Sequence, residues 1–257
     1  MSILDEIVEH TKARVARDKR AGLPIGAPPR NADFSFPFEK ALKTGDIAFI
    51  CEVKKASPSK GVIAEDFPYL DIAGAYAEAG ADAISVLTEP DFFLGSDAYL
   101  SEIRGAVDIP LLRKDFVIDA FQIKQAACLG ADAILLICSI LTPDRLTGYI
   151  KEADRFGLSC LVEAHNEDEL KTAVSVGARV VGVNNRDLKT FEVDTGNSLR
   201  LRKLTPPEIT FVSESGVRTA RDVDILRQNG VDAVLIGETL MRAADKKAAL
   251  AALRGIS

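Results

Sequence analysis

Four stretches of the chain share one pattern: GADAISVL at residues 80–87, GADAILLI at 130–137, GARVVGV at 177–183 and GVDAVLI at 230–236. In each, a glycine is followed by a further residue, then Asp or Arg, and then an apolar run, and the four starts are about 50 residues apart. Glycine commonly ends a helix, and an unbroken run of Ala, Val, Ile and Leu suits a parallel strand covered on both faces. The pattern therefore predicts four helix–strand junctions in a parallel sheet.

Four shorter apolar runs alternate with these, at residues 47–54, 109–112, 158–163 and 209–213. The stretches between the runs have helical apolar spacing, and several begin with Asp or Thr and end in Gly. Eight strand–helix pairs with a period of about 25 residues predict a (β/α)8 TIM barrel, an α/β fold. A doubly wound open sheet is the alternative, but no GxGxxG follows a strand and opens a helix, and the repeat continues evenly to the C-terminus.

The length of 257 residues fits one domain or two, and the even repeat favours one. We expect a single TIM-barrel domain over residues 1–257, with an N-terminal helical extension at 1–45 and eight βα units at 46–257. Within the extension, Pro and Gly in the stretch 22–34 separate a first helix from a short second helix at 36–42. Leu4, Val8, Thr11 and Val15 fall on one side of the first helix.

Composition narrows the classes of function. The formal charge is -6, so the chain lacks the basic excess that binding to nucleic acid requires. Four cysteines without a CxxC pair are typical of buried free thiols in a reducing compartment, and no signal peptide or membrane-spanning run is present, so we expect a cytoplasmic protein. With two histidines and no Cys/His cluster, we expect no metal.

Charged residues stand at the predicted carboxyl ends of alternate strands, where a barrel builds its active site. Glu52 and Lys54 are two residues apart and so face the same side of the first strand, Lys114 ends the third and Glu163 the fifth. One such residue alone would more often be a solvated rim residue, but side chains of alternate strands can meet in one layer of the barrel interior. Such a cluster would shift the pKa values of its members and supply an acid and a base, so we interpret it as catalytic.

Glycine-containing turns follow the seventh and eighth strands, where barrels commonly bind phosphate with backbone N–H groups. The candidates are Ser215, Gly216, Gly237 and Glu238. Phe92, Phe93 and Phe116 follow the second and third strands and could form a slot for an aromatic ring. His165 is expected just outside a helix start, because Asn166 and Glu169 have capping-box spacing, and it is left out of the site.

At this point the sequence resembles the indole-3-glycerol phosphate synthase family over essentially the whole chain. Six blocks carry the resemblance in order: EVKKASPSKG, LLRKDF, LVEAH, GVNNRDL, VSESG and LIGETLM. The resemblance implies that 1-(2-carboxyphenylamino)-1-deoxyribulose 5-phosphate loses carbon dioxide and water to give indole-3-glycerol phosphate, a step of tryptophan biosynthesis, with no cofactor or metal. The partner it implies is a small anionic phosphorylated substrate, and we expect no nucleic acid, no membrane, and a monomer or weak homo-oligomer.

The resemblance also implies roles for residues. Lys114 would be the general acid at the ribulose carbonyl, Glu163 would act in later steps, and Lys54 with Glu52 would assist closure, decarboxylation and dehydration. Asn184 would bind the substrate or the catalytic groups, Arg186 would orient Glu52, and Ser57 would bind substrate. The anthranilate slot would be lined by Pro58, Phe93, Phe116 and Leu135, and the phosphate would lie at Ser215, Gly216, Gly237 and Glu238.

Glu238 departs from part of the family, since some members carry Ser there. A carboxylate beside a phosphate is unfavourable, so we expect its backbone N–H to serve and its side chain to point away. Two other functions compete with this interpretation: a sugar-phosphate isomerase on another phosphate-binding barrel, and a non-catalytic scaffold on a decayed barrel. The chain lacks the Asp pair or Cys/Asp pair of such isomerases, since Cys51 faces away from Glu52, and its four charged strand ends argue against decay.

Overall fold

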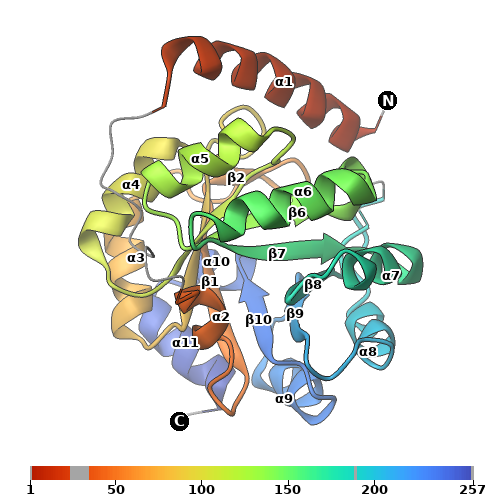
Figure 1. Ribbon diagram of the computed structural model, residues 1–257. Coiled ribbons are helices and arrows are strands. Elements are labelled where there is room, and N and C mark those ends of the chain that lie inside the picture. The colour runs from red at the N-terminus through yellow and green to blue at the C-terminus, as the bar shows by residue number, and fades with distance from the viewer. Residues whose placement is uncertain (1, 24–34, 188–189, 256–257) are drawn as a thin grey trace.

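The computed structural model describes residues 2–23, 35–187 and 190–255. Within these residues, eight parallel strands close into a barrel in the order β1-β10-β9-β8-β7-β6-β5-β4, and helices cover it outside (Figure 1). The predicted (β/α)8 barrel is therefore confirmed. The barrel strands are β1 (Ala48–Val53), β4 (Ala83–Leu87), β5 (Leu111–Lys114), β6 (Ala133–Ile137), β7 (Ser159–Ala164), β8 (Val180–Asn184), β9 (Thr210–Glu214) and β10 (Ala233–Ile236).

Helices connect successive strands, and two more follow the last strand. They are α3 (Tyr69–Glu78), α4 (Asp97–Ala106), α5 (Ala120–Cys128), α6 (Pro143–Asp154), α7 (Glu167–Ser175), α8 (Gly196–Arg202), α9 (Ala220–Gln228), α10 (Glu238–Arg242) and α11 (Lys246–Arg254), with a 3-10 turn η1 (Cys138–Ile140) before α6. A small antiparallel hairpin, β2 (Ala56–Ser57) with β3 (Gly61–Val62), follows β1.

The N-terminal extension forms α1 (Ile3–Ala21) and the short α2 (Pro37–Ala41), as predicted. Thr11 and Val15 are buried on α1 together with Ile7, and α1 lies outside the ring of helices beside α5 (Figure 1). Phe38 and Leu42, at α2, join the apolar cluster inside the barrel. The predicted helix break at 22–34 lies, for residues 24–34, outside the described residues.

The Asp of the repeated pattern has a structural role at the barrel's amino end. The carboxylates of Asp82, Asp132 and Asp232 accept the backbone N–H groups of Phe49, Leu111 and Phe211, each at the start of a neighbouring strand, at 2.7–2.9 Å. Each of these three Asp side chains thus ties the strand that follows it to the preceding strand of the barrel. The third repeat carries Arg179 instead, which pairs with Glu39 and Asp154.

One predicted strand is displaced along the chain. The apolar run 109–112 predicts a strand there, but β5 begins at Leu111 and continues to Lys114. Pro110 has no N–H to give to the ladder, so only its carbonyl pairs, accepting Ile84 N at 2.9 Å. Lys114 is the last residue of β5, as predicted, so the sheet fixes the direction of its side chain.

The apolar layer inside the barrel should contribute strongly to stability. Leu112 is fully buried in it, so Leu112→Ala should lower the free energy of unfolding by about 2–5 kcal/mol. Leu204→Ala is the matched control, because that side chain is 53% exposed, and it should change stability little. Urea denaturation followed by circular dichroism measures both. Equal losses in the two variants would contradict the assignment of the core.

Candidate active site

A cavity of about 440 Å³ opens at the carboxyl ends of the barrel strands. This is a volume suited to a small organic ligand. Ile3, Leu4 and Ile7 of α1 form part of its wall, so the extension completes the cavity that the barrel begins. Of the predicted site residues, only Phe92 does not line it, and that ring packs edge-on against His10 of α1. The others all line it: Glu52, Lys54, Ser57, Pro58, Phe93, Lys114, Phe116, Leu135, Glu163, Asn184, Arg186, Ser215, Gly216, Gly237 and Glu238.

The predicted charged cluster is brought together by β1, β5 and β7. Lys114 Nζ lies 3.6 Å from Glu163 Oε2, and the ammonium of Lys54 hydrogen-bonds the carboxylate of Glu52. Both carboxylates are 3% exposed. Charges held this deep are strongly coupled, because water screens them little.

Sequence reasoning missed one member of the cluster. Glu214, at the end of β9, accepts a 2.5 Å hydrogen bond from Lys114 Nζ and is 1% exposed. The sequence does contain a signal for Glu214. Glu214 and Val212 are two residues apart on one strand, so their side chains share a face, and Val212 faces the barrel interior. Gly182 on β8 makes room for it: a Cβ there would lie 2.1 Å from Glu214 Oε1.

Burial and neighbouring charge set the protonation of this cluster. Burial alone would lower the pKa of Lys114, but Glu214, Glu163 and Glu52 outweigh it and raise that pKa. Burial would raise the pKa of Glu163, yet Lys114 and His165 hold it below its usual range. For Glu214, burial and repulsion from Glu163 prevail over Lys114 and raise the pKa. The site thus holds a protonated lysine between an ionised carboxylate and one that takes a proton more readily.

The turns after β9 and β10, where the sequence predicts a phosphate site, both have constrained backbones. Ser215 and Gly216 both have positive φ, at 68° and 93°, and Ser215 Oγ donates to Asn184 Oδ1 at 3.0 Å. At Gly237, a Cβ would lie 2.3 Å from Glu52 Oε1, so only glycine leaves that carboxylate its place.

The Glu238 side chain is held by two cations of the cavity lining. Its carboxylate lies 3.1 Å from Arg242 Nε and 3.6 Å from Lys60 Nζ. Its negative charge is therefore compensated at this end of the cavity. That the side chain points away from a bound phosphate stays a prediction.

An aromatic wall faces the cavity. The ring centroids of Phe93 and Phe116 are 5.9 Å apart. The loop that carries Phe93 is shaped by buried Glu89, whose carboxylate accepts the backbone N–H groups of Asp91, Phe92 and Phe93 at 2.7–3.0 Å. Phe93 is thereby fixed in a loop that would otherwise leave three amides without partners.

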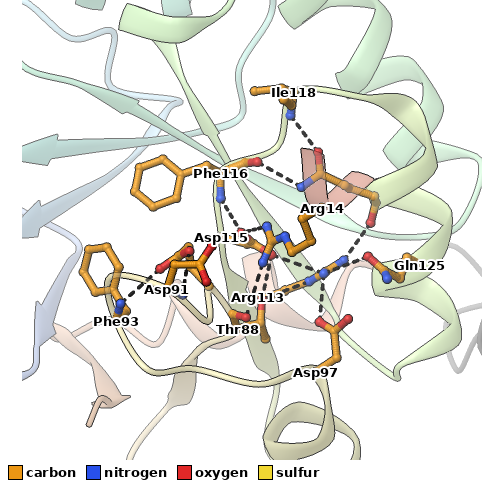
Figure 2. Close-up of polar contacts among 12 residues, drawn as sticks. Arg14, Thr88, Asp91, Phe93, Asp97, Arg113, Asp115, Phe116, Ile118 and Gln125 are labelled. Carbon is orange, nitrogen blue, oxygen red and sulfur yellow. Dashed lines mark hydrogen bonds and ion pairs between the residues drawn. The ribbon is translucent and has the colours of Figure 1, made fainter. Parts of the chain in front are cut away.

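Beside Phe116 lies a buried network of arginines and carboxylates (Figure 2). Asp115 accepts from the backbone N–H of Phe116 at 2.7 Å and from Thr88 Oγ1 at 2.9 Å. Arg14 of α1 reaches it at 2.5 Å, and Arg113 lies at 3.2 Å. Asp115 thus links the N-terminal helix to its two sequence neighbours, Lys114 and Phe116, which line the cavity.

Two further residues have contacts that sequence reasoning did not foresee. His165 stands just before α7, as predicted, and also faces Glu163, with Nε2 at 3.3 Å from Glu163 Oε1. Arg186 Nη1 donates to the carbonyl of Phe191 at 3.1 Å, and its backbone N–H donates to Asn184 Oδ1. Its predicted contact with Glu52 stays a prediction.

The described residues include neither a membrane-spanning helix nor a cluster of metal-ligating side chains. No helix among them is both long enough and apolar enough to cross a membrane. They also contain no group of three or more His, Cys, Asp or Glu side chains arranged to hold a metal ion.

The fold and the cavity define a TIM-barrel enzyme with a buried lysine–carboxylate cluster beside an aromatic wall. Comparison with known proteins gives the family. Residues 4–253 match the family model described as indole-3-glycerol phosphate synthase, and the chain belongs to that family.

Its relatives cover nearly its full length. The chain is 59% identical over 257 residues to the indole-3-glycerol phosphate synthase of Ruminiclostridium cellulolyticum, with 98% of this chain and 99% of that protein covered. It is 54% identical over 245 residues to that of Endomicrobium trichonymphae, covering 93% and 95%. A crystal structure of 3-hexulose-6-phosphate synthase from Salmonella typhimurium is similar with a TM-score of 0.67 at 13% identity, over 82% of this chain and 98% of that one, which shows the fold alone.

The contact between Arg14 and Asp115 should hold α1 over the cavity. Arg14→Met removes a buried charge from Asp115 but leaves Arg113, so we expect a loss of about 2–3 kcal/mol in the free energy of unfolding. Arg17→Met is the control on the same helix, since that side chain is 68% exposed, and it should change little. Urea denaturation of both variants tests this, and equal stability of the two would refute the role of Arg14.

Proposed function

We propose that the buried cluster performs the ring closure of this family: 1-(2-carboxyphenylamino)-1-deoxyribulose 5-phosphate loses carbon dioxide and water and becomes indole-3-glycerol phosphate. The observation that carries the assignment of roles is the ammonium of Lys114, held by Glu214 and Glu163 in a cavity with an aromatic wall. The substrate brings a carboxylate, a phosphate and an aromatic ring, and the cavity has groups suited to each.

Ring closure needs an acid at the ribulose carbonyl. The aromatic carbon that bears the carboxylate attacks the carbonyl carbon, a C–C bond forms, and the carbonyl oxygen takes a proton from Lys114 Nζ. The raised pKa of Lys114 keeps it protonated near neutral pH, and an alkoxide is basic enough to take that proton. Glu214 and Glu163 hold the ammonium in position.

The two later steps need an acid and a base. In decarboxylation the bond from the ring carbon to the carboxylate breaks, and its electron pair restores the aromatic ring. In dehydration the new hydroxyl leaves as water, while the neighbouring carbon loses a proton. Glu52 of β1 and Lys54, which directly follows that strand, are hydrogen-bonded to each other and supply the base and the acid. Glu163 stabilises positive charge on the ring nitrogen.

Binding would divide the substrate between the two ends of the cavity. Phe93, Phe116, Pro58 and Leu135 would take the anthranilate ring, with Ser57 beside it. Backbone N–H groups near Ser215, Gly216, Gly237 and Glu238 would take the phosphate. Lys60 and Arg242 leave Glu238 compensated, which lets an anion approach in spite of that carboxylate.

Other properties follow as proposals of the same kind. We propose that acid–base chemistry suffices, with no cofactor or metal, and that residues 1–257 form one domain. Four free cysteines among the described residues support a reducing, cytoplasmic location. We also propose a monomer or weak homo-oligomer that binds neither nucleic acid nor membrane.

Removing the proposed general acid should stop turnover. Lys114→Met should lower kcat by about 10²–10⁴-fold, the range of general acid catalysis, with far-ultraviolet circular dichroism unchanged. Formation of the fluorescent indole product, followed in the presence of a chelator, measures this. Lys124→Met is the control, because that lysine is about half exposed on α5, and it should retain full activity. Absence of product with the unaltered chain, or full activity of Lys114→Met, would overturn the proposal.

A further inference from the structure

His165 lies between two carboxylates at the edge of the cluster. Its Nδ1 is 2.9 Å from Glu169 Oε2, and its Nε2 is 3.3 Å from Glu163 Oε1. The side chain is 16% exposed, so the imidazole is largely withdrawn from water. A neutral imidazole has one N–H, whereas each ring nitrogen here has a carboxylate oxygen nearby. Nδ1 is hydrogen-bonded to Glu169, while Nε2 lies at ion-pair distance from Glu163 without hydrogen-bond geometry. The arrangement suits the imidazolium form.

The position of the ring is fixed from several elements. His165 follows β7 and lies two residues beyond Glu163. Its backbone N–H donates to Glu169 at 2.9 Å, and Asn197 of α8 donates to its carbonyl at 3.0 Å. Glu169, in the first turn of α7, thus holds both the backbone and the ring of His165. The ring therefore has little freedom to leave Glu163.

The groups around His165 and Glu163 favour a positively charged His165. Burial would lower the pKa of His165, but Glu163 and Glu169 outweigh it and raise the pKa to about 10. Cys138, from η1, hydrogen-bonds the backbone carbonyl of Glu169 at 3.6 Å, and burial raises its thiol pKa to about 12, so it stays neutral. Lys114 faces Glu163 from β5, and the Asn184 amide reaches it from β8.

We propose that His165 is a positioning residue: a permanent cation that keeps Glu163 ionised and in place while Lys114 gives up its proton. The inference rests on the proposed function, in which Lys114 is the acid. It adds a role for a residue that touches no reacting atom and acts only through Glu163.

The need for a second cation follows from charge. When Lys114 transfers its proton, Glu163 is left 3.6 Å from a neutral amine, with Glu52 and Glu214 close by. A buried carboxylate without a cation takes up a proton, because burial disfavours its charged form. His165 is a neighbouring cation that the transfer leaves unchanged. Glu163 can then remain an anion opposite the positive charge that develops on the substrate.

The charge of His165 can be measured without activity. The chain has two histidines, so long-range ¹⁵N–¹H correlation spectra of the histidine-labelled protein contain two imidazole patterns, assigned with His10→Gln. His165 should keep the doubly protonated pattern at about pH 8, well above the ordinary histidine pKa of ~6.5. A neutral tautomer of His165 at that pH would overturn the proposal.

The kinetic test separates positioning from a merely structural role. In His165→Gln the pKa of Glu163 should rise, because burial is then opposed by Lys114 and Asn184 alone. The acid limb of the kcat–pH profile should move up by about one pH unit, a loss of about tenfold on that limb, with KM changed little. His165→Lys, which restores a positive charge, should recover part of the loss.

A matched control and a second variant complete the design. His10→Gln alters the other histidine, an α1 residue that is about half exposed and pairs with Asp91, and its profile should match that of the unaltered protein. Glu169→Gln keeps the imidazole and removes one carboxylate, so its His165 should titrate at lower pH than in the unaltered protein. Superimposable profiles for His165→Gln and the unaltered protein, or an unchanged His165 titration in Glu169→Gln, would contradict the inference. If the unaltered protein forms no product, the proposed function fails while the spectra still decide the charge of His165.

Discussion

The burial of one ammonium, Lys114, among carboxylates is the interaction on which the site depends. A lone charge at this depth would be expelled or neutralised, so the barrel must bring compensating groups from several strands at once. Glu52, Glu163 and Glu214 come from β1, β7 and β9, which with β5 alternate around the barrel. Gly182 and Gly237, on or next to the strands between them, lack the Cβ that would displace two of these carboxylates. The carboxylates around Lys114 therefore depend on glycine at these two positions.

That arrangement is held from below by apolar packing. The layer beneath the cluster is built of small and branched residues from every strand, and α2 contributes Phe38 to it. The repeated Asp at the amino end helps to fix the strand register by accepting a backbone N–H at the start of a neighbouring strand. A slip by one residue would turn an inward carboxylate toward the helices, so the register that stabilises the fold also decides which charges meet.

The strands and most of the site could be predicted from the sequence because both depend on local signals. Glycine ends, apolar runs and period-two alternation are local signals, and they were enough to place Glu52, Lys54, Lys114 and Glu163 in one layer. Glu214 was missed because VSESG was interpreted only as a phosphate turn, and its neighbour Gly182 is informative only once two strands are paired. The start of β5 after Pro110 was also missed, because the pairing of β4 with β5 decides which residues join the ladder.

The N-terminal extension shows how an addition to a complete barrel becomes part of its chemistry. The eight strands close without α1, yet Ile3, Leu4 and Ile7 wall the cavity. The link is Asp115, which accepts from Arg14 on one side and from the backbone of Phe116 on the other. Because Lys114 immediately precedes Asp115, a shift of α1 is transmitted within one residue to the proposed acid and to the aromatic wall. The helix is therefore tied to the cavity in two ways, through a buried ion pair and through apolar side chains in the cavity wall.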